Sequence, residues 1–483
     1  MAGMSRIVVI GAGVGGLAAA ARLAAAGHRV TVHERAAAVG GKLGSYERDG
    51  FRFDTGPSLL TLPQVFADLG LDLSPVALDP VVRHCFPDGS VLDSSSDPDV
   101  FRSRIEAAFG AAAGADWARF WVRAERIWRA SWRSVLQREV TPATLAGLSW
   151  RVGDLAAIAP WRSLRSLGRQ YLRDPRLRML VDRYATYTGA DPRRAPAALA
   201  AIPYAELAFG GWYLAGGLGV LATALLDRCR SLGVEVVTCS PVERIRSTAG
   251  RATGVRLCSG AEVDADVVVA NVDALSVYRD LLPAPARLGG LAARSLAGFV
   301  LLLGVRGQTP QLAHHTVFFP RDYDAEFAAV FGSPGTGARA RPPSDPAVFV
   351  TRAADPAVHP DGTEAWFVLV NAPRHGTSFG AVDWRRPGLA DAYGRHILNV
   401  LAARGLDVRD RLLFTETRTP ADLADATGAP GGAIYGTAGG LTRPANRGPL
   451  AGLFLVGGST HPGGGLPMVA LSAKIVADTI GPA

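Results

Sequence analysis

The first 34 residues carry the pattern that most restricts how this chain can fold. Residues 11–16, GAGVGG, form a GxGxxG motif between an expected buried strand at 5–10 and an expected helix at 15–26. The first glycine permits a tight turn, the second lets a pyrophosphate approach the backbone, and the third lets helix and strand pack closely. Glu34 ends a second expected strand, 29–34, where a carboxylate can accept hydrogen bonds from ribose hydroxyls. The unit therefore predicts a dinucleotide site in a parallel sheet rather than a chance glycine turn.

Two further glycine-rich segments extend this prediction. Gly40, Gly41 and Lys42 follow the acid closely, as in FAD proteins of the glutathione-reductase type, although an ordinary surface turn is the alternative. Near the other end, residues 452–472 predict a strand, a glycine loop and a helix that begins near Met468. The N-terminus of such a helix carries a positive dipole end, which favours an anionic reduced flavin beside it. The alternative here is a glycine-rich turn into a C-terminal helix.

Composition narrows the class of protein. Of the 483 residues, 48% are hydrophobic and 19% are charged, which supports a sizeable core in two or three domains and excludes a disordered chain. The four cysteines form no CxxC pair and no cluster with histidine, so we expect neither a metal site nor disulfides, and a cytoplasmic location fits. The apolar start has features of a signal peptide, but the phosphate-loop pattern interrupts it. No segment predicts a transmembrane helix, so any membrane attachment would be peripheral.

The positive charge of the chain is concentrated in one segment. The formal net charge is +8, and residues 117–178 alone hold 13 arginines against four carboxylates, a local balance of +9. Trp117, Trp121, Trp128 and Trp132 in this segment share one stripe of an expected helix. A tryptophan stripe with basic neighbours predicts contact with an anionic membrane surface. A plain core helix is the alternative, and nucleic acid is not expected because no aromatic–basic sheet pattern is present.

Four segments carry a resemblance to a known family. They are VIGAGVGGLAAAARLAAAGHRV near the start, GFRFDTGPSLLTLP from residue 50, QLAHHTVFFP at 311–320 and THPGGGLP from residue 460. Over nearly its whole length the chain resembles the bacterial carotenoid desaturases of the phytoene type, within the superfamily of FAD-dependent amine oxidases. The resemblance implies an α/β fold with a Rossmann-like FAD-binding domain of the glutathione-reductase type, a sheet-based substrate domain and a helical cap.

The resemblance also implies domain boundaries and cofactor contacts. We expect a discontinuous FAD-binding domain formed by residues 1–75, 220–295 and 440–483. A substrate domain is expected at 76–99 and 296–439, and a cap that faces the membrane at 100–219. The family's flavin contacts fall on Gly11, Gly13, Gly16, Glu34, Arg35, Gly41, Lys42, Pro57, Val242, Gly458 and Met468. One departure is Gly464, where the family more often has Ala, Ser, Thr or Val.

The activity implied is desaturation of a carotenoid. A hydride passes to the flavin N5 and a proton leaves the neighbouring carbon, and a weak base suffices because the developing allylic cation is delocalised. Asp174 and Arg178, in YLRDPRLR, resemble the family segment in which an acid and an arginine face the flavin, so they are candidate catalytic residues. The structural alternative makes Asp174 a helix N-cap and Arg178 its i+4 partner. His461 lies in the glycine loop, where we expect it to position the loop rather than to transfer protons.

The substrate and its rivals follow from the same resemblance. The expected substrate is a long apolar isoprenoid, either phytoene or a later, hydroxylated carotenoid, because residues 368–376 and 431–436 resemble the subgroup that acts on hydroxylated or methoxylated carotenoids. The expected electron acceptor is a quinone or oxygen, and the oligomeric state is open. The alternatives are a related carotenoid isomerase or oxidase on the same fold, and a non-catalytic prenyl-lipid binding protein.

Overall fold

A five-stranded parallel sheet forms the centre of the nucleotide-binding part of the molecule. The computed structural model describes residues 3–141, 144, 146–147, 150–282, 291, 294–437 and 443–483. The strand order is β10-β2-β1-β14-β22, and the strands are β1 (Arg6–Ile10), β2 (Arg29–His33), β10 (Glu235–Val237), β14 (Val267–Ala270) and β22 (Leu453–Leu455). Their β-branched and apolar residues are buried on both faces, as parallel strands require. The expected α/β fold is confirmed.

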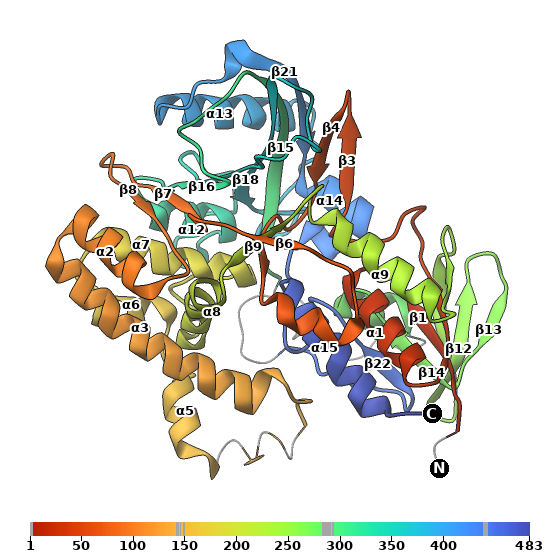
Figure 1. Ribbon diagram of the computed structural model, residues 1–483. Coiled ribbons are helices and arrows are strands. Elements are labelled where there is room, and N and C mark those ends of the chain that lie inside the picture. Colours follow the sequence, from red (N-terminus) through yellow and green to blue (C-terminus); the bar gives the residue numbers. More distant parts are fainter. Residues whose placement is uncertain are drawn as a thin grey trace.

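Helices cover one face of this sheet and a second sheet covers the other. The covering helices are α1 (Val14–Ala25), α9 (Gly219–Ser231) and α15 (Leu466–Ile480), whose apolar sides share one buried cluster with the sheet. On the opposite face lies an antiparallel sheet of β11 (Val242–Thr248), β12 (Arg251–Leu257) and β13 (Glu262–Asp264), with α10 (Ala274–Ser276) and η5 (Val277–Leu281) beside it. Segments from the two ends of the chain therefore lie side by side, as Figure 1 shows for α1 and α15.

A seven-stranded mixed sheet forms the second unit. Its order is β21-β15-β18-β17-β16-β7-β8, and all pairs are antiparallel except that of β16 with β7. The strands are β7 (Arg83–Cys85), β8 (Val91–Asp93), β15 (Ala297–Arg306), β16 (His315–Phe318), β17 (Val348–Arg352), β18 (Thr363–Ala372) and β21 (Leu412–Arg418). On it pack α12 (Tyr323–Phe331), α13 (Leu389–Ala403) and α14 (Pro420–Thr427). The strands expected at 297–305 and 365–370 are thus confirmed as neighbours in a separate sheet.

Short strands and turns connect the two sheets. The small elements are β3 (Ser45–Arg48), β4 (Phe51–Asp54), β5 (Leu60–Thr61), β6 (Pro75–Ala77), β9 (Gly211–Leu214), β19 (Arg374–His375), β20 (Ala381–Val382), η1 (Pro63–Leu69), η6 (Pro334–Thr336), η7 (Arg409–Arg411) and η8 (Pro430–Gly432). β5, β9 and β6 form a three-stranded sheet, which joins the chain near residue 60 to the end of the helical region.

The third unit is a helical cap that lies to the left of the five-stranded parallel sheet in Figure 1. It contains α2 (Pro98–Phe109), α3 (Ala111–Ser131), η2 (Trp132–Leu136), α5 (Val152–Ile158), α6 (Leu164–Tyr171), α7 (Pro175–Arg183), η3 (Tyr184–Thr188), η4 (Ala197–Ala200) and α8 (Ala201–Phe209). Its core is one cluster of aliphatic and aromatic side chains, which also reaches α12 and β16. In the part of the chain that the structure describes, no helix is long and apolar enough to cross a bilayer.

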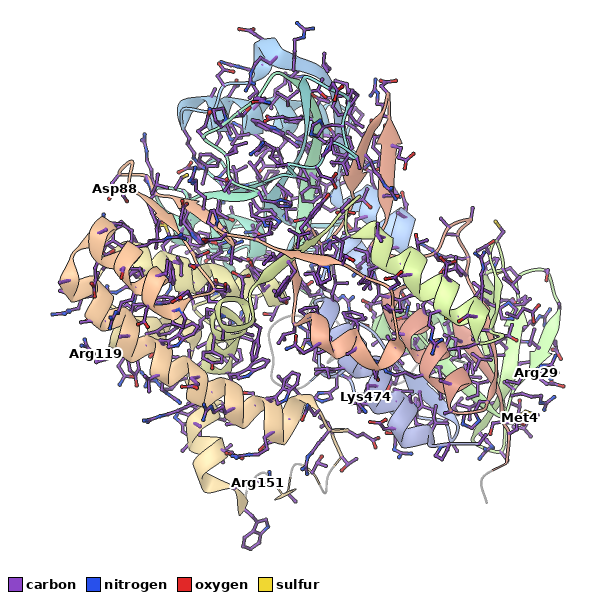
Figure 2. All side chains as sticks on the ribbon, in the orientation of Figure 1. Met4, Arg29, Asp88, Arg119, Arg151 and Lys474 are labelled. Carbon is purple, nitrogen blue, oxygen red and sulfur yellow. The ribbon has the colours of Figure 1, made fainter. Side chains whose placement is uncertain are left out.

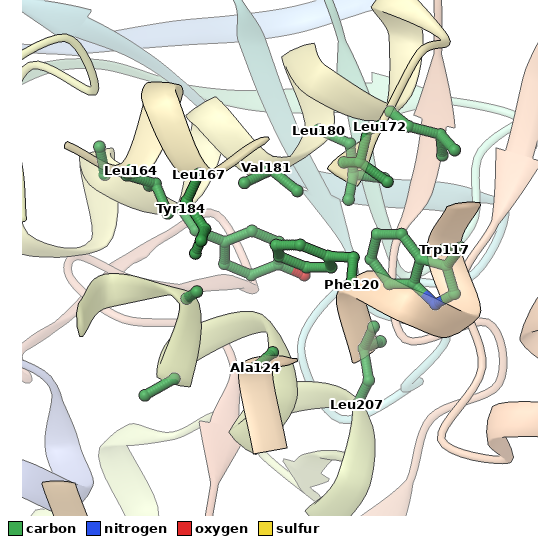
Figure 3. Packing of buried hydrophobic residues seen from close by; sticks show 14 of the residues in the cluster. Trp117, Phe120, Ala124, Leu164, Leu167, Leu172, Leu180, Val181, Tyr184 and Leu207 are labelled. Carbon is green, nitrogen blue, oxygen red and sulfur yellow. The ribbon is translucent and has the colours of Figure 1, made fainter. Parts of the chain in front are cut away.

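The tryptophan stripe of α3 points into this cap and not outward. Trp117 and Trp128 are only 2% and 8% exposed, and Trp121 and Trp132 pack against the same cluster. Figure 3 shows Trp117 among the apolar residues of the cap core. The stripe therefore belongs to the cap core, as in the alternative of a core helix, and contact of the wider segment 117–178 with a membrane stays a prediction. A continuous aromatic stripe marks the buried side of an amphipathic helix, and the charged residues occupy its other side.

Candidate cofactor site and active centre

The turn between β1 and α1 has the form of a phosphate-binding loop. Gly11 has a φ of +94°, and a Cβ built on Gly16 would lie 2.1 Å from the carbonyl oxygen of Gly11. A Cβ on Gly13 would lie 2.7 Å from the side chain of Asn271. All three positions therefore require glycine. α1 begins after Gly13 with no side chain capping it, so its N-terminal N–H groups and positive dipole end suit a pyrophosphate.

The glycine pair after the second strand lies against this loop. The N–H of Gly40 donates to Ala12 O at 2.9 Å, and a Cβ on Gly41 would lie 3.3 Å from the Cα of Gly13. Gly56 packs against the backbone of this glycine pair, because a Cβ there would lie 1.9 Å from Lys42 O. Pro57, the next residue, therefore lies beside the same turn. The expectation that Gly41 and Pro57 belong to the cofactor site stays a prediction, and their placement fits it.

Glu34 is buried at the end of β2. Its carboxylate accepts hydrogen bonds from the N–H groups of Ala12, at 2.7 Å, and Ala36, at 2.8 Å. The N–H of Ser240 donates to the backbone oxygen of Glu34 at 2.8 Å, so the segment that leads to Val242 runs alongside. The acid thus holds the phosphate loop at the place where a ribose would lie, and Val242 begins the strand beside it.

Arg35 and Lys42 point toward the unit that contains the seven-stranded sheet. The guanidinium of Arg35 donates to Asp425 O at 2.8 Å, and the Lys42 ammonium donates to Ala433 O at 2.9 Å and Ile434 O at 2.6 Å. Burial lowers the pKa of Lys42 to about 8. Both side chains therefore connect the nucleotide unit to the segment before the second glycine loop. Their hydrogen bonds here go to backbone oxygens of that segment, and their contact with FAD stays a prediction.

The second glycine loop meets the first. Gly457 Cα would lie 3.2 Å from a Cβ on Gly15, and Gly464 Cα would lie 3.5 Å from a Cβ on Gly458. α15 begins after Gly465 without a side-chain cap, and Met468 lies in its first turn. Two uncapped helix N-termini, of α1 and α15, therefore follow two glycine loops that touch. This arrangement fits a dinucleotide flavin that extends from one loop to the other.

Asn271 joins the two loops, and the sequence reasoning missed it. With its amide oxygen turned toward the first loop, it accepts from the N–H groups of Gly13, at 3.2 Å, and Gly16, at 3.3 Å. A Cβ on Gly457 would lie 2.7 Å from the same amide. The available signal was its position directly after β14, at the carboxyl end of a strand beside β1, where ligands of parallel sheets bind.

Buried polar groups hold the second loop in place. The hydroxyl of Ser472 accepts from the Gly457 N–H at 3.2 Å, and the amide of Asn446 donates to His461 O at 2.9 Å. The His461 ring nitrogen Nε2 lies 3.1 Å from Val135 O and 2.9 Å from Arg138 O, in the cap. Burial lowers the pKa of His461, so its neutral ring can donate to the cap. These contacts fit the positioning role expected for this histidine.

The candidate catalytic pair makes local structural contacts. Asp174 caps α7 by accepting from the N–H of Arg176 at 2.8 Å, and it forms an ion pair with the Arg176 side chain. Arg176 also pairs with Asp88, which lies in the turn between β7 and β8 and is labelled in Figure 2. Arg178 donates to Leu172 O at 2.6 Å. These contacts are those of the structural alternative, and none of them joins the pair to a glycine loop.

Comparisons with known proteins agree with this site. Residues 14–298 match the profile of the family described as "Flavin containing amine oxidoreductase". The chain is 33% identical to a 4,4'-diapolycopene oxygenase of Methylomonas, with 98% of each chain covered, and 30% identical to a 1-hydroxycarotenoid 3,4-desaturase of Flavobacterium, with 99% of each covered. Its fold is similar to that of a Methanosarcina mazei oxidoreductase, with a TM-score of 0.64 at 17% identity, over 98% of this chain and 100% of that one.

The family match begins inside the first glycine loop, at Val14, and includes α1, β2, the cap, β10 and β14. The full-length similarity to enzymes named for carotenoids adds β1, most of the seven-stranded sheet and the second glycine loop to the part of the chain that is matched. The chain belongs to the flavin-containing amine oxidoreductase family, in the branch that contains the carotenoid desaturases, and its cofactor is FAD.

Proposed function

We propose that the protein is a desaturase that introduces double bonds into a long apolar carotenoid, either phytoene or a later, hydroxylated intermediate. The observation that carries this proposal is the full-length similarity to a 1-hydroxycarotenoid 3,4-desaturase, in a chain whose two glycine loops meet at Asn271. FAD, when bound, supplies the two-electron acceptor for a hydride removed from an allylic carbon. A proton leaves the neighbouring carbon, and the carbon–carbon double bond forms between the two. Reoxidation by a quinone or oxygen completes the proposed cycle.

The residues of the chain bind, orient and shield the reactants. The uncapped starts of α1 and α15 suit the negative charges of the cofactor. The bonds from His461 to the cap hold the cap over the second loop, and apolar side chains of the cap exclude water from its interior. Delocalisation of the allylic cation makes its proton easy to remove, so the reaction needs no strong base. The main requirement is therefore that the protein holds the apolar substrate in one orientation.

Asp174 and Arg178 remain the proposed polar pair, and one variant separates their two roles. Asparagine caps a helix as well as aspartate does, so Asp174→Asn keeps the cap while removing the charge. If Asp174 is catalytic, the variant keeps its melting temperature and loses kcat. If Asp174 is structural, kcat is unchanged. Thr419 heads α14 in the same way, and Thr419→Ser is the matched control for altering a cap without loss of a charge.

Product mass tests the proposed reaction. The purified protein should show a flavin absorption spectrum, and incubation with defined carotenoids in liposomes should give products that are lighter by two hydrogens per new double bond. The oxygenase alternative, which the similarity to a 4,4'-diapolycopene oxygenase supports, adds oxygen instead. An isomerase leaves the mass unchanged, and a prenyl-lipid binding protein binds carotenoid without flavin. Any of these three results contradicts the desaturase proposal.

We also propose that the cap contacts the membrane through α5 and not through the stripe of α3. Trp150 and Trp161 flank α5 and are 86% and 68% exposed, in contrast to the buried tryptophans of α3. Arg126 and Arg151 are exposed in the same unit, and Figure 2 shows Arg151 at the lower end of the cap. Exposed tryptophans with arginines suit the interface of an anionic bilayer, from which an apolar substrate would enter.

A further inference from the structure

Arg183, the last residue of α7, carries a buried positive charge that no carboxylate neutralises directly. Its side chain is buried, with 7% of the residue exposed. Within the described part of the chain it forms no ion pair, and its Nη1 atom has no hydrogen-bond partner. Its guanidinium carbon lies 5.1 Å from the centre of the Tyr187 ring and 5.7 Å from that of Phe349. Burying a charge costs free energy unless the charge is paired or hydrogen-bonded. We therefore expect a further hydrogen-bond acceptor for the Arg183 guanidinium.

Glu206, on α8, carries the opposite charge close by. It is 1% exposed, its Oε1 accepts a hydrogen bond from the Tyr184 hydroxyl at 2.8 Å, and its Oε2 has no partner. Burial raises the pKa of Tyr187, and its phenol hydroxyl is close enough to hydrogen-bond with both Arg183 and Glu206. These contacts still leave Nη1 of Arg183 and Oε2 of Glu206 without a partner. One unused donor and one unused acceptor result.

The pair lies between the cap and the flavin loop. Phe349 belongs to β17 of the large sheet, and Tyr184 belongs to the cap core shown in Figure 3. The Tyr435 ring packs beside the end of η3, because a Cβ on Gly189 would lie 3.1 Å from its Cδ2 atom. The Tyr435 ring in turn touches the second glycine loop, because a Cβ on Gly464 would lie 2.3 Å from its Cδ1 atom. Tyr435 thus lies between that loop and η3, which follows Arg183 directly in the chain.

We propose that Arg183 and Glu206 bind a hydroxyl group at the end of the carotenoid substrate. A hydroxyl oxygen accepts a hydrogen bond and its hydrogen is donated, so one group satisfies both the free Nη1 donor and the free Oε2 acceptor. A hydrocarbon end satisfies neither and leaves both atoms, Nη1 and Oε2, without a hydrogen-bond partner. The inference rests on the proposed function and narrows its substrate class to carotenoids with a hydroxylated end. It also places that end, and not the middle of the chain, next to the flavin loop.

The test compares two substrates that differ by one hydroxyl. A carotenoid with a terminal hydroxyl and the same polyene without it are presented in phosphatidylcholine liposomes to the FAD-loaded protein. We expect the wild type to prefer the hydroxylated compound by roughly 10- to 100-fold in kcat/KM, the range for a hydrogen bond to a charged group. Glu206→Gln removes the acceptor charge and should abolish most of this preference, mainly through a higher KM for the hydroxylated compound.

Two further variants keep the test independent of stability. The double change Arg183→Met with Glu206→Leu replaces the buried pair by apolar residues, which often leaves a fold intact, and it should lose the preference for the hydroxylated compound while keeping its melting temperature and flavin content. Glu125→Gln is the matched control. Glu125, on α3, likewise accepts a hydrogen bond from a tyrosine hydroxyl, that of Tyr204, but it already forms an ion pair with Arg129. This control should keep the wild-type preference.

The outcomes separate the inference from the proposed function. Equal kcat/KM for the two compounds in the wild type, or an equal loss on both in Glu206→Gln, would overturn the inference while leaving desaturation established. If neither compound is turned over, the desaturase proposal fails. Quenching of tryptophan fluorescence then still reports the binding of each compound. A dissociation constant at least several-fold lower for the hydroxylated one would support the site, and equal constants would overturn it.

Discussion

Gly464 and Tyr435 should be coupled, because a single methyl group at position 464 collides with the ring. A Cβ on Gly464 would lie 2.3 Å from Cδ1 of Tyr435 and 3.2 Å from Cγ. Carbon atoms pack at roughly 3.5–4.0 Å, so the ring or the loop must move by more than about 1 Å. The ring has little room to retreat, since a Cβ on Gly189, on its other edge, would lie only 3.1 Å from Cδ2.

The expected cost of Gly464→Ala is that of overpacking, about 1–3 kcal/mol. If the ring yields, the cost appears as a lower free energy of unfolding. If the loop yields, it appears as weaker FAD binding by roughly 5- to 150-fold, the same free energy expressed as an affinity. Thermal unfolding of the flavin-free protein and titration of that protein with FAD measure the two contributions.

A double-mutant cycle identifies the partner of the added methyl. Tyr435→Ala removes the ring, so adding Gly464→Ala to it should cost almost nothing, and the coupling energy should equal most of the 1–3 kcal/mol. Gly168→Ala is the matched control, because its Cβ would lie in ordinary contact, 3.7 Å from Val181. If Gly464→Ala melts and binds FAD like the wild type while Tyr435 is intact, the reasoning is refuted.

Three further predictions follow from described contacts. Gly13→Val should yield protein with at least roughly 10-fold weaker FAD affinity, and retention of full flavin content would contradict the assignment of the loop. Burial lowers the pKa of Lys42 from 10.5 to about 8, so the folded protein releases this proton before the unfolded chain does and gains about 3 kcal/mol of stability between pH 8 and 10.5. Lys42→Met should flatten that rise in a comparison of chemical unfolding at pH 8 and 10.5, and an unchanged rise would exclude Lys42 as its source. Trp150→Ala with Trp161→Ala should weaken binding to anionic liposomes even at high salt, whereas Arg29→Gln, on the opposite side of the molecule, should not.

The local sequence predicted the nucleotide unit well because its signals are short-range. The strand expected at 5–10 is found at Arg6–Ile10, and the helix expected at 15–26 is found at Val14–Ala25. The tryptophan stripe was assigned to the wrong environment because periodicity defines one face of a helix but not what covers it. Asn271 was missed because one polar residue after a strand has no distinguishing pattern. Arg183 and Glu206 could not be found because two charges 23 positions apart become neighbours only once α7 and α8 pack.

The discontinuous flavin sheet has a consequence for how the protein is made. β1 and α1 leave the ribosome first, yet β22 of the same sheet and α15, which packs on α1, are encoded more than 440 residues after them. At about 5–20 residues per second, roughly 20–90 seconds separate the two ends. Throughout that interval the apolar side of α1 that α15 will cover stays open, and the second glycine loop does not exist. A complete cofactor site therefore requires the whole chain, and a ribosome that stops before residue 453 releases a chain with a cap and most of the seven-stranded sheet but without the second glycine loop.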